Sequence, residues 1–228
     1  MTEHSPATVP TGVAGETTPF ETAWADVRDA LLRGLTHALS NRVMAIANLA
    51  ELTSGPAGAP DARAGEVLAA ESRRLDTLLR QFRMLGATDS AQCEPVHLGE
   101  LLPSVVALGA RHPEAADLPC ELTVAPATPL AWGDPVRLQR VTLVLIVAAT
   151  RVARRIGVPL VRVLVWGDER AAVVSVSASR PEAIPPVDHA AAAVPPGAHD
   201  VLVDRRPGGA VRYDLRMATL TEARRRGA

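Results

Sequence analysis

The feature that most constrains the fold is a proline-free stretch from Phe20 to Thr53 with a helical pattern of apolar residues. These residues recur every three or four positions, at Val27, Leu31, Leu35, Leu39, Val43, Ile46 and Leu49. The spacing predicts one amphipathic helix, about 50 Å long at a rise of about 1.5 Å per residue.

A second helix is expected directly after the first. Ser54-Gly55-Pro56 and Gly58-Ala59-Pro60 break the first helix, Asp61 is a suitable N-cap, and Gly86 marks the end of the second. Its apolar positions are Val67, Leu68, Leu75, Leu78, Leu79, Phe82 and Leu85. Two long helices joined by a short turn form an antiparallel hairpin with one apolar stripe and little core of its own. We therefore expect a homodimer, in which two hairpins bury their stripes in a four-helix bundle.

The rest of the chain mixes strands with helices. The expected strands are Glu121–Val124, Pro129–Trp132, Leu160–Trp166, Ala172–Ser177, Val201–Val203 and Val211–Met217. A short helix is expected over about Leu98–Ala110, and a longer one from its N-cap Asp134 to about Arg155. Arg180–Ala198 is typical of a loop, and Arg224–Arg226 of a frayed, charged end. The predicted fold class is α+β.

Composition narrows the function. A net charge of −1 gives no global basic field that would hold nucleic acid. Cys93 and Cys120 are too few for a metal cage or a disulfide framework. The longest apolar run, Val141–Ala149, is too short to cross a bilayer. Residues 1–19, predicted to be a disordered leader, lack the basic start and apolar segment of a signal peptide. We expect a cytoplasmic protein that binds neither nucleic acid nor a membrane.

A motif in the first helix resembles the H-box of sensor histidine kinases. The stretch Thr36-His37-Ala38-Leu39-Ser40-Asn41-Arg42-Val43-Met44-Ala45-Ile46 contains a histidine followed by Leu, Asn and two apolar residues at the positions of that motif. It also lies where the family has it, in the first helix of a hairpin. The resemblance implies that His37 is a phosphoacceptor.

The second half resembles the ATP-binding domain of the same kinases. Pro95-Val96-His97-Leu98-Gly99-Glu100-Leu101-Leu102 looks like the entry segment of that domain. Trp132-Gly133-Asp134-Pro135-Val136-Arg137-Leu138-Gln139-Arg140-Val141 looks like the lead-in to its N-box helix. The resemblance covers about residues 20–220, and it implies an ATPase-like α/β sandwich after the hairpin.

Several departures from the family suggest that this ATPase-like domain is degenerate. Val144 and Ala148 occupy the positions of the N-box asparagines, and neither side chain offers the oxygen that magnesium requires. The Asp-x-Gly-x-Gly motif is replaced by Ala178-Ser179-Arg180-Pro181-Glu182, and Pro181–Pro196 contains no glycine for a lid. Ala38 replaces the acid that follows the phosphorylated histidine. We therefore predict that the chain binds no ATP and no cofactor.

The chemistry that remains is phosphoryl transfer between proteins. Arg33, His37 and Asn41 are four residues apart, so they share one face of the helix, away from the apolar seam. Neutral imidazole is a nucleophile near pH 7, and a receiver domain that donates phosphate brings its own magnesium ion. Arg33 would steady phosphate charge and Asn41 would orient a phosphoryl oxygen or a water. Surface residues such as Arg42, Arg63 and Arg73 would set the choice of receiver.

The pattern as a whole resembles the dimeric histidine phosphotransferases. The implied domains are a leader over 1–19, a dimerisation and phosphotransfer hairpin over 20–87, and a degenerate kinase-like ATPase domain over 95–228. The implied partners are response-regulator receivers and a hybrid histidine kinase. Two alternatives stay open: a catalytically dead pseudokinase that acts as a dimeric scaffold, and a divergent active kinase.

Overall fold

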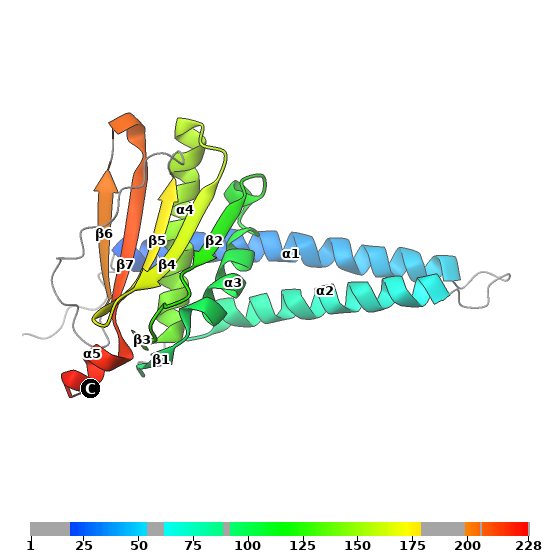
Figure 1. Ribbon diagram of the computed structural model, residues 1–228. Coiled ribbons are helices and arrows are strands. Elements are labelled where there is room, and N and C mark those ends of the chain that lie inside the picture. The colour runs from blue at the N-terminus through cyan, green and yellow to red at the C-terminus, as the bar shows by residue number, and fades with distance from the viewer. Residues whose placement is uncertain (1–18, 54–61, 89–91, 179–198, 206, 228) are drawn as a thin grey trace, which may run out of the picture.

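The computed structural model describes residues 19–53, 62–88, 92–178, 199–205 and 207–227. The α+β class expected from the sequence is confirmed: a long helical hairpin is followed by a mixed sheet with helices (Figure 1). The first 18 residues of the expected 1–19 leader, the break at 54–61 and the loop at 180–198 lie outside the described residues, while Pro19 begins the first helix. Among the helices that are described, none has the length and hydropathy needed to span a membrane.

The hairpin consists of α1 (Pro19–Thr53) and α2 (Ala62–Gly86). Both helices begin and end within about a residue of the positions that the apolar spacing and the Gly86 stop signal predict. The two helices run side by side, and their far end projects well beyond the rest of the molecule (Figure 1).

The second half is built on a five-stranded sheet in the order β2-β4-β5-β7-β6. Its strands are β2 (Cys120–Val124), β4 (Val161–Gly167), β5 (Ala171–Ala178), β6 (His199–Arg205) and β7 (Val211–Ala218). Strands β2 and β4 are parallel, and the other neighbours are antiparallel. All five lie within a few residues of their expected positions.

A second, two-stranded sheet lies at the start of the second half. It pairs β1 (Glu94–Val96) with β3 (Ala131–Gly133) in antiparallel register, Pro95 opposite Trp132. The sequence does not predict the strand at Glu94–Val96, because three residues are too few to show an alternating pattern. The helix α3 (Leu98–Gly109) follows, and then a short 3-10 helix, η1 (Pro113–Ala115).

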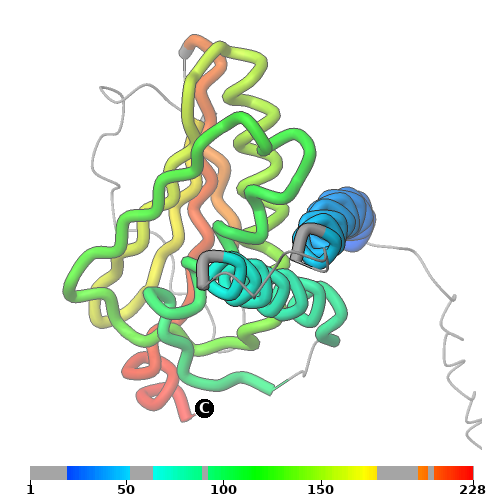
Figure 2. The backbone as a smooth tube through the Cα atoms, turned by 90° about the vertical axis from the view of Figure 1, so that its right-hand side faces the viewer, coloured from blue at the N-terminus to red at the C-terminus, as the bar shows by residue number. Residues whose placement is uncertain are grey.

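The helix α4 (Pro135–Ile156) is the centre of the molecule. The Asp134 carboxylate caps it by accepting hydrogen bonds from the backbone N–H groups of Val136, at 2.8 Å, and Arg137, at 3.4 Å. Gly157 ends it in the left-handed conformation, with φ 70°. Figure 2 shows α4 between the sheet and α1. Because the helix packs on both sides, half of its own residues are buried.

The N-terminal half of α1 packs on α4, and this corrects one expectation. Trp24, Val27, Leu31 and Leu35 are all buried within the single chain. The Arg140 guanidinium of α4 lies 5.3 Å from the centroid of the Trp24 ring. The prediction that the apolar stripe needs a second chain to cover it is therefore wrong for this half of α1. Helical periodicity predicts which face of α1 is apolar, but it does not predict which element of the fold packs against that face.

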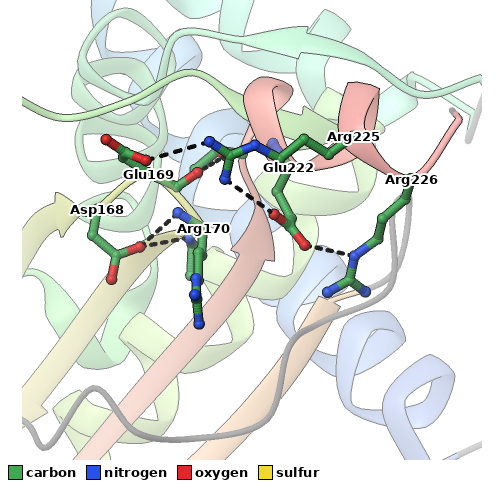
Figure 3. Close-up of polar contacts among 8 residues, drawn as sticks. Asp168, Glu169, Arg170, Glu222, Arg225 and Arg226 are labelled. Carbon is green, nitrogen blue, oxygen red and sulfur yellow. Dashed lines mark hydrogen bonds and ion pairs between the residues drawn. The ribbon is translucent and has the colours of Figure 1, made fainter.

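The C-terminal tail is ordered, which corrects the expectation of a frayed end. Residues Leu220–Arg225 form α5, and the Thr219 hydroxyl caps it by accepting from the Glu222 N–H at 3.1 Å. Arg225 pairs with Glu169 of the β4–β5 turn at 3.4 Å, and Arg226 donates to Glu222 at 2.6 Å (Figure 3). The Arg225–Glu169 pair links the arginine-rich end to the β4–β5 turn, whereas the Arg226–Glu222 pair lies within the C-terminal segment itself.

Candidate functional site

The three residues singled out on α1 lie on one exposed face. Arg33, His37 and Asn41 are each exposed, one helical turn apart. The Asn41 amide nitrogen Nδ2 lies 3.3 Å from Nε2 of His37. When the amide donates this hydrogen bond, Nε2 is the acceptor and the ring proton is on Nδ1. Nε2 then carries the lone pair that a nucleophile needs.

A pocket of about 480 Å³ surrounds His37. One wall is the α1 face with Arg33, His37, Asn41 and Arg42, and the other wall is the segment after α3 that contains Arg111. Among the described residues that line it, three are arginines and none is acidic. Guanidinium groups bind phosphate and carboxylate through several N–H donors, so the lining suits an anion.

The Arg42 side chain is held by a carboxylate from the second helix. Its Nη1 lies 3.3 Å and 3.2 Å from the two carboxylate oxygens of Glu71, which also pairs with Arg74. Glu71 is only 6% exposed. Burial raises the pKa of this carboxyl, but hydrogen bonds from Arg74 and Arg42 outweigh it, so the net pKa is lowered. Glu71 therefore stays ionised near neutral pH and fixes Arg42 at the pocket.

The second wall is tied to α1 by a close backbone contact at Gly34. A Cβ placed on Gly34 would lie 1.9 Å from the carbonyl oxygen of Arg111. Only glycine lets the helix approach the Arg111 backbone this closely. The contact brings the turn after α3 beside the helix, three residues before His37.

A polar network fixes the turn that carries Arg111. The next residue, His112, is 2% exposed, and its Nδ1 accepts a hydrogen bond from the Glu114 N–H at 3.2 Å. The Glu114 carboxylate accepts two hydrogen bonds from Arg151 of α4, at 2.9 Å and 3.1 Å. Arg154 donates to the Glu114 carbonyl at 2.6 Å. The turn is thereby attached to α4, the central helix.

The described positions that correspond to the nucleotide-site motifs of kinases do not line the pocket at His37. Val144 and Ala148 are half-buried on α4, and Ala178 is buried at the end of β5, while 179–182 lie outside the described residues. None of these three side chains offers an oxygen ligand for magnesium. Within the described parts of the chain, no group of three or more His, Cys, Asp or Glu side chains is placed to hold a metal ion. Cys93 and Cys120 are free thiols.

Sequence reasoning found the α1 half of this site and missed the rest. Gly34 and Arg111 gave no signal, because their contact joins segments far apart in the chain. Glu71 did give one. It lies four residues before Leu75 and seven before Leu78, so it is an acid on the apolar stripe of the second helix. Such an acid predicts a buried ion pair with a cation of the facing helix.

Comparison with known proteins finds likeness only among solved structures. No protein-family model matches the sequence, and no curated protein matches it. The chain is similar to histidine kinase AdeS of Acinetobacter baumannii, with 14% identity over 83% of this chain and 97% of that one, at a TM-score of 0.40. It is also similar to histidine kinase ThkA in complex with response regulator protein TrrA, with 13% identity, 90% and 68% coverage and a TM-score of 0.38. The ThkA catalytic domain alone is 13% identical, over 58% of this chain and 99% of that domain, with a TM-score of 0.42. The solved structures named here are thus all histidine kinases.

Proposed function

We propose that this chain is a histidine phosphotransfer protein of a two-component phosphorelay. His37 accepts a phosphoryl group from the aspartyl phosphate of a response-regulator receiver and passes it to another receiver. The observation that carries the proposal is the exposed His37 of an H-box-like sequence, which lines a pocket whose described lining contains three arginines and no acid. A phosphoryl group is the ligand class that both the nucleophile and its cationic surroundings suit.

The transfer balances without any group bound by this chain. The Asn41 amide first turns from Nε2 of His37 to a phosphoryl oxygen, which frees the Nε2 lone pair. That lone pair attacks phosphorus, the P–O bond to the aspartate breaks, and the aspartate carboxylate leaves with the bonding electron pair. The ring keeps its proton on Nδ1. The receiver supplies the magnesium ion that neutralises the phosphoryl oxygens, while Arg33 and Asn41 orient them from α1. The reverse reaction uses the same atoms.

Transfer without ATP is supported by the second half of the chain. Val144 and Ala148 cannot ligate magnesium, and the stretch at 178–182 has neither the aspartate nor the glycines of the kinase motif. Ala38 follows His37 where kinases carry an acid. We therefore expect transfer without ATP, because these positions of the second half lack the groups with which a kinase holds ATP, and α1 lacks the acid beside the histidine.

The experiment presents the purified protein with phosphorylated receivers from the same genome. We expect label on this chain that is stable in base, labile in acid and absent from His37→Ala. His97→Gln is the matched control, because His97 is also exposed but lies at the start of α3, outside the pocket. If a receiver binds wild type and His37→Ala equally and transfers no label, the chain is a pseudokinase scaffold. Magnesium-dependent ATP binding would instead make it a divergent kinase.

A further inference from the structure

The cations of the pocket around His37 come from both halves of the chain. Arg33 and Arg42 are on α1, whereas Arg111 is on the turn after α3. The close contact between the Arg111 carbonyl and Gly34 brings that turn against the helix beside the phosphoacceptor. The second half therefore contributes directly to the wall that faces His37.

The three arginines differ in how they are paired. Glu71 accepts two contacts from Arg42, so part of the Arg42 charge is neutralised. Arg33 and Arg111 are exposed, and neither makes a side-chain hydrogen bond or ion pair with another residue in the described segments. A guanidinium with unused donors at the edge of an anion pocket is available to bind a phosphoryl oxygen.

The backbone under Arg111 is held, so its side chain starts from a fixed place. The Arg111 N–H donates to the Leu108 carbonyl at 2.9 Å, and the following residues are attached to α4 through Glu114 and Arg151. A donor on a fixed backbone loses less freedom when it binds than one on a mobile loop. The arrangement suits a residue that stabilises a group carried on α1.

We propose that Arg111 binds the phosphoryl group on His37, so that the second half of the chain completes the phosphoryl site on the hairpin. This inference rests on the function proposed above. The Arg111 guanidinium donates hydrogen bonds to phosphoryl oxygens once the N–P bond has formed, and it favours phosphohistidine over the aspartyl phosphate of the receiver. A degenerate ATPase-like half thus keeps a part in phosphoryl chemistry that needs no nucleotide.

The test measures how label divides at equilibrium between this chain and a phosphorylated receiver domain that exchanges phosphate with it. We expect Arg111→Ala to shift this ratio about tenfold toward the receiver, a size typical of one charge-assisted hydrogen bond. Arg111→Lys should recover part of the shift, because it restores a charge without the planar fork. Receiver affinity and the thermal midpoint should stay at wild-type values. Arg155→Ala is the control, since Arg155 is exposed on the last turn of α4 and does not line the pocket.

A second arm uses phosphoramidate, a small phosphoryl donor that needs no receiver. We expect Arg111→Ala to take up label on His37 several-fold more slowly than wild type and Arg155→Ala, because the pocket attracts the anionic donor less strongly. If wild type is labelled and Arg111→Ala matches it in both arms, Arg111 has no phosphoryl role and the phosphotransfer function stands. If wild type takes no label from receivers or phosphoramidate, the proposed function fails and this inference fails with it.

Discussion

At the scale of single residues, Gly34 determines how closely the two halves of the chain meet. Its missing side chain leaves room for the Arg111 carbonyl, and that contact sets the distance between α1 and the turn with the third arginine. A carbonyl oxygen is part of the backbone, so it cannot turn aside as a flexible side chain would.

Gly34→Ala should therefore destabilise the protein although alanine favours helices. The new Cβ would lie 1.9 Å from the Arg111 oxygen, so α1 or the turn must move. We expect the free energy of unfolding to fall by about 1–3 kcal/mol, the usual cost of overpacking, as measured by urea denaturation. The control is Gly65→Ala on α2, where a Cβ meets nothing within 4 Å. That variant should match wild type or gain up to about 1 kcal/mol. Equal results for the two variants would contradict the close contact.

His112 should make the stability depend on pH in mildly acidic solution. Burial lowers the pKa of this histidine from its ordinary 6.5, and of its charged neighbours Glu114 raises it while Arg151 and Arg33 lower it further. The unfolded chain then takes up a proton more readily than the native protein. Stability is full above the unfolded pKa and falls as the pH drops through the native one. Denaturation at a series of pH values should show this decline.

The variant His112→Asn separates this effect from that of other groups. Asparagine keeps an acceptor for the Glu114 N–H but does not titrate. The decline that begins near the ordinary histidine pKa of 6.5 should flatten in the variant, while the loss in more acidic solution, where carboxylates such as Glu114 take up protons, should remain. An unchanged slope in His112→Asn would contradict the role of His112 in this decline.

At the scale of elements, the hairpin divides into two parts with different surroundings. The first half of α1 is covered by α4, whereas large apolar side chains elsewhere on the hairpin are exposed. These are Val43 (55% exposed), Met44 (61%), Val67 (44%), Leu68 (45%) and Leu79 (48%). An exposed apolar patch on a helical hairpin is typical of an interaction surface.

We expect this surface to join two chains in a homodimer, as the bundle interpretation predicts. The double variant Val43→Asp, Leu68→Asp should sediment as a monomer at micromolar concentrations where wild type is a dimer, because charges on the apolar surface oppose its burial. Its circular dichroism should be unchanged. Val203→Asp, on the edge strand β6, should leave the dimer intact, since Val203 is 50% exposed outside the hairpin. A monomeric wild type would refute the dimer.

At the scale of the whole molecule, a feature could be predicted from the sequence when the residues that determine it are close together along the chain. The hairpin and α4 follow from periodicity and from caps such as Asp134 and Gly157, which act over a few residues. The pairing of β1 with β3 and the sheet order depend on contacts between distant segments, so no local pattern predicts them.

The candidate site divides in the same way. His37 and Asn41 were found because they lie together in one helical motif, and their 3.3 Å contact follows from the four-residue spacing. Arg111 could not be found, because its place depends on how the turn after α3 docks on α1. Glu71 lies between these cases. Its position on the apolar stripe of α2 is visible in the sequence, but the sequence does not show that Arg42 is its partner.

The packing of α4 on α1 also has a consequence during synthesis, because α1 is made before the helix that packs on it. The side chains of Trp24, Val27, Leu31 and Leu35 leave the ribosome well before the α4 residues that will cover them. At roughly 5–20 residues per second, this apolar surface stays open for several seconds. We expect this surface to be open to a chaperone or to a second nascent hairpin until α4 has been made. Once α4 covers these four side chains, we expect a second chain to meet the outer part of the hairpin instead, where Val43, Met44 and Leu68 are exposed.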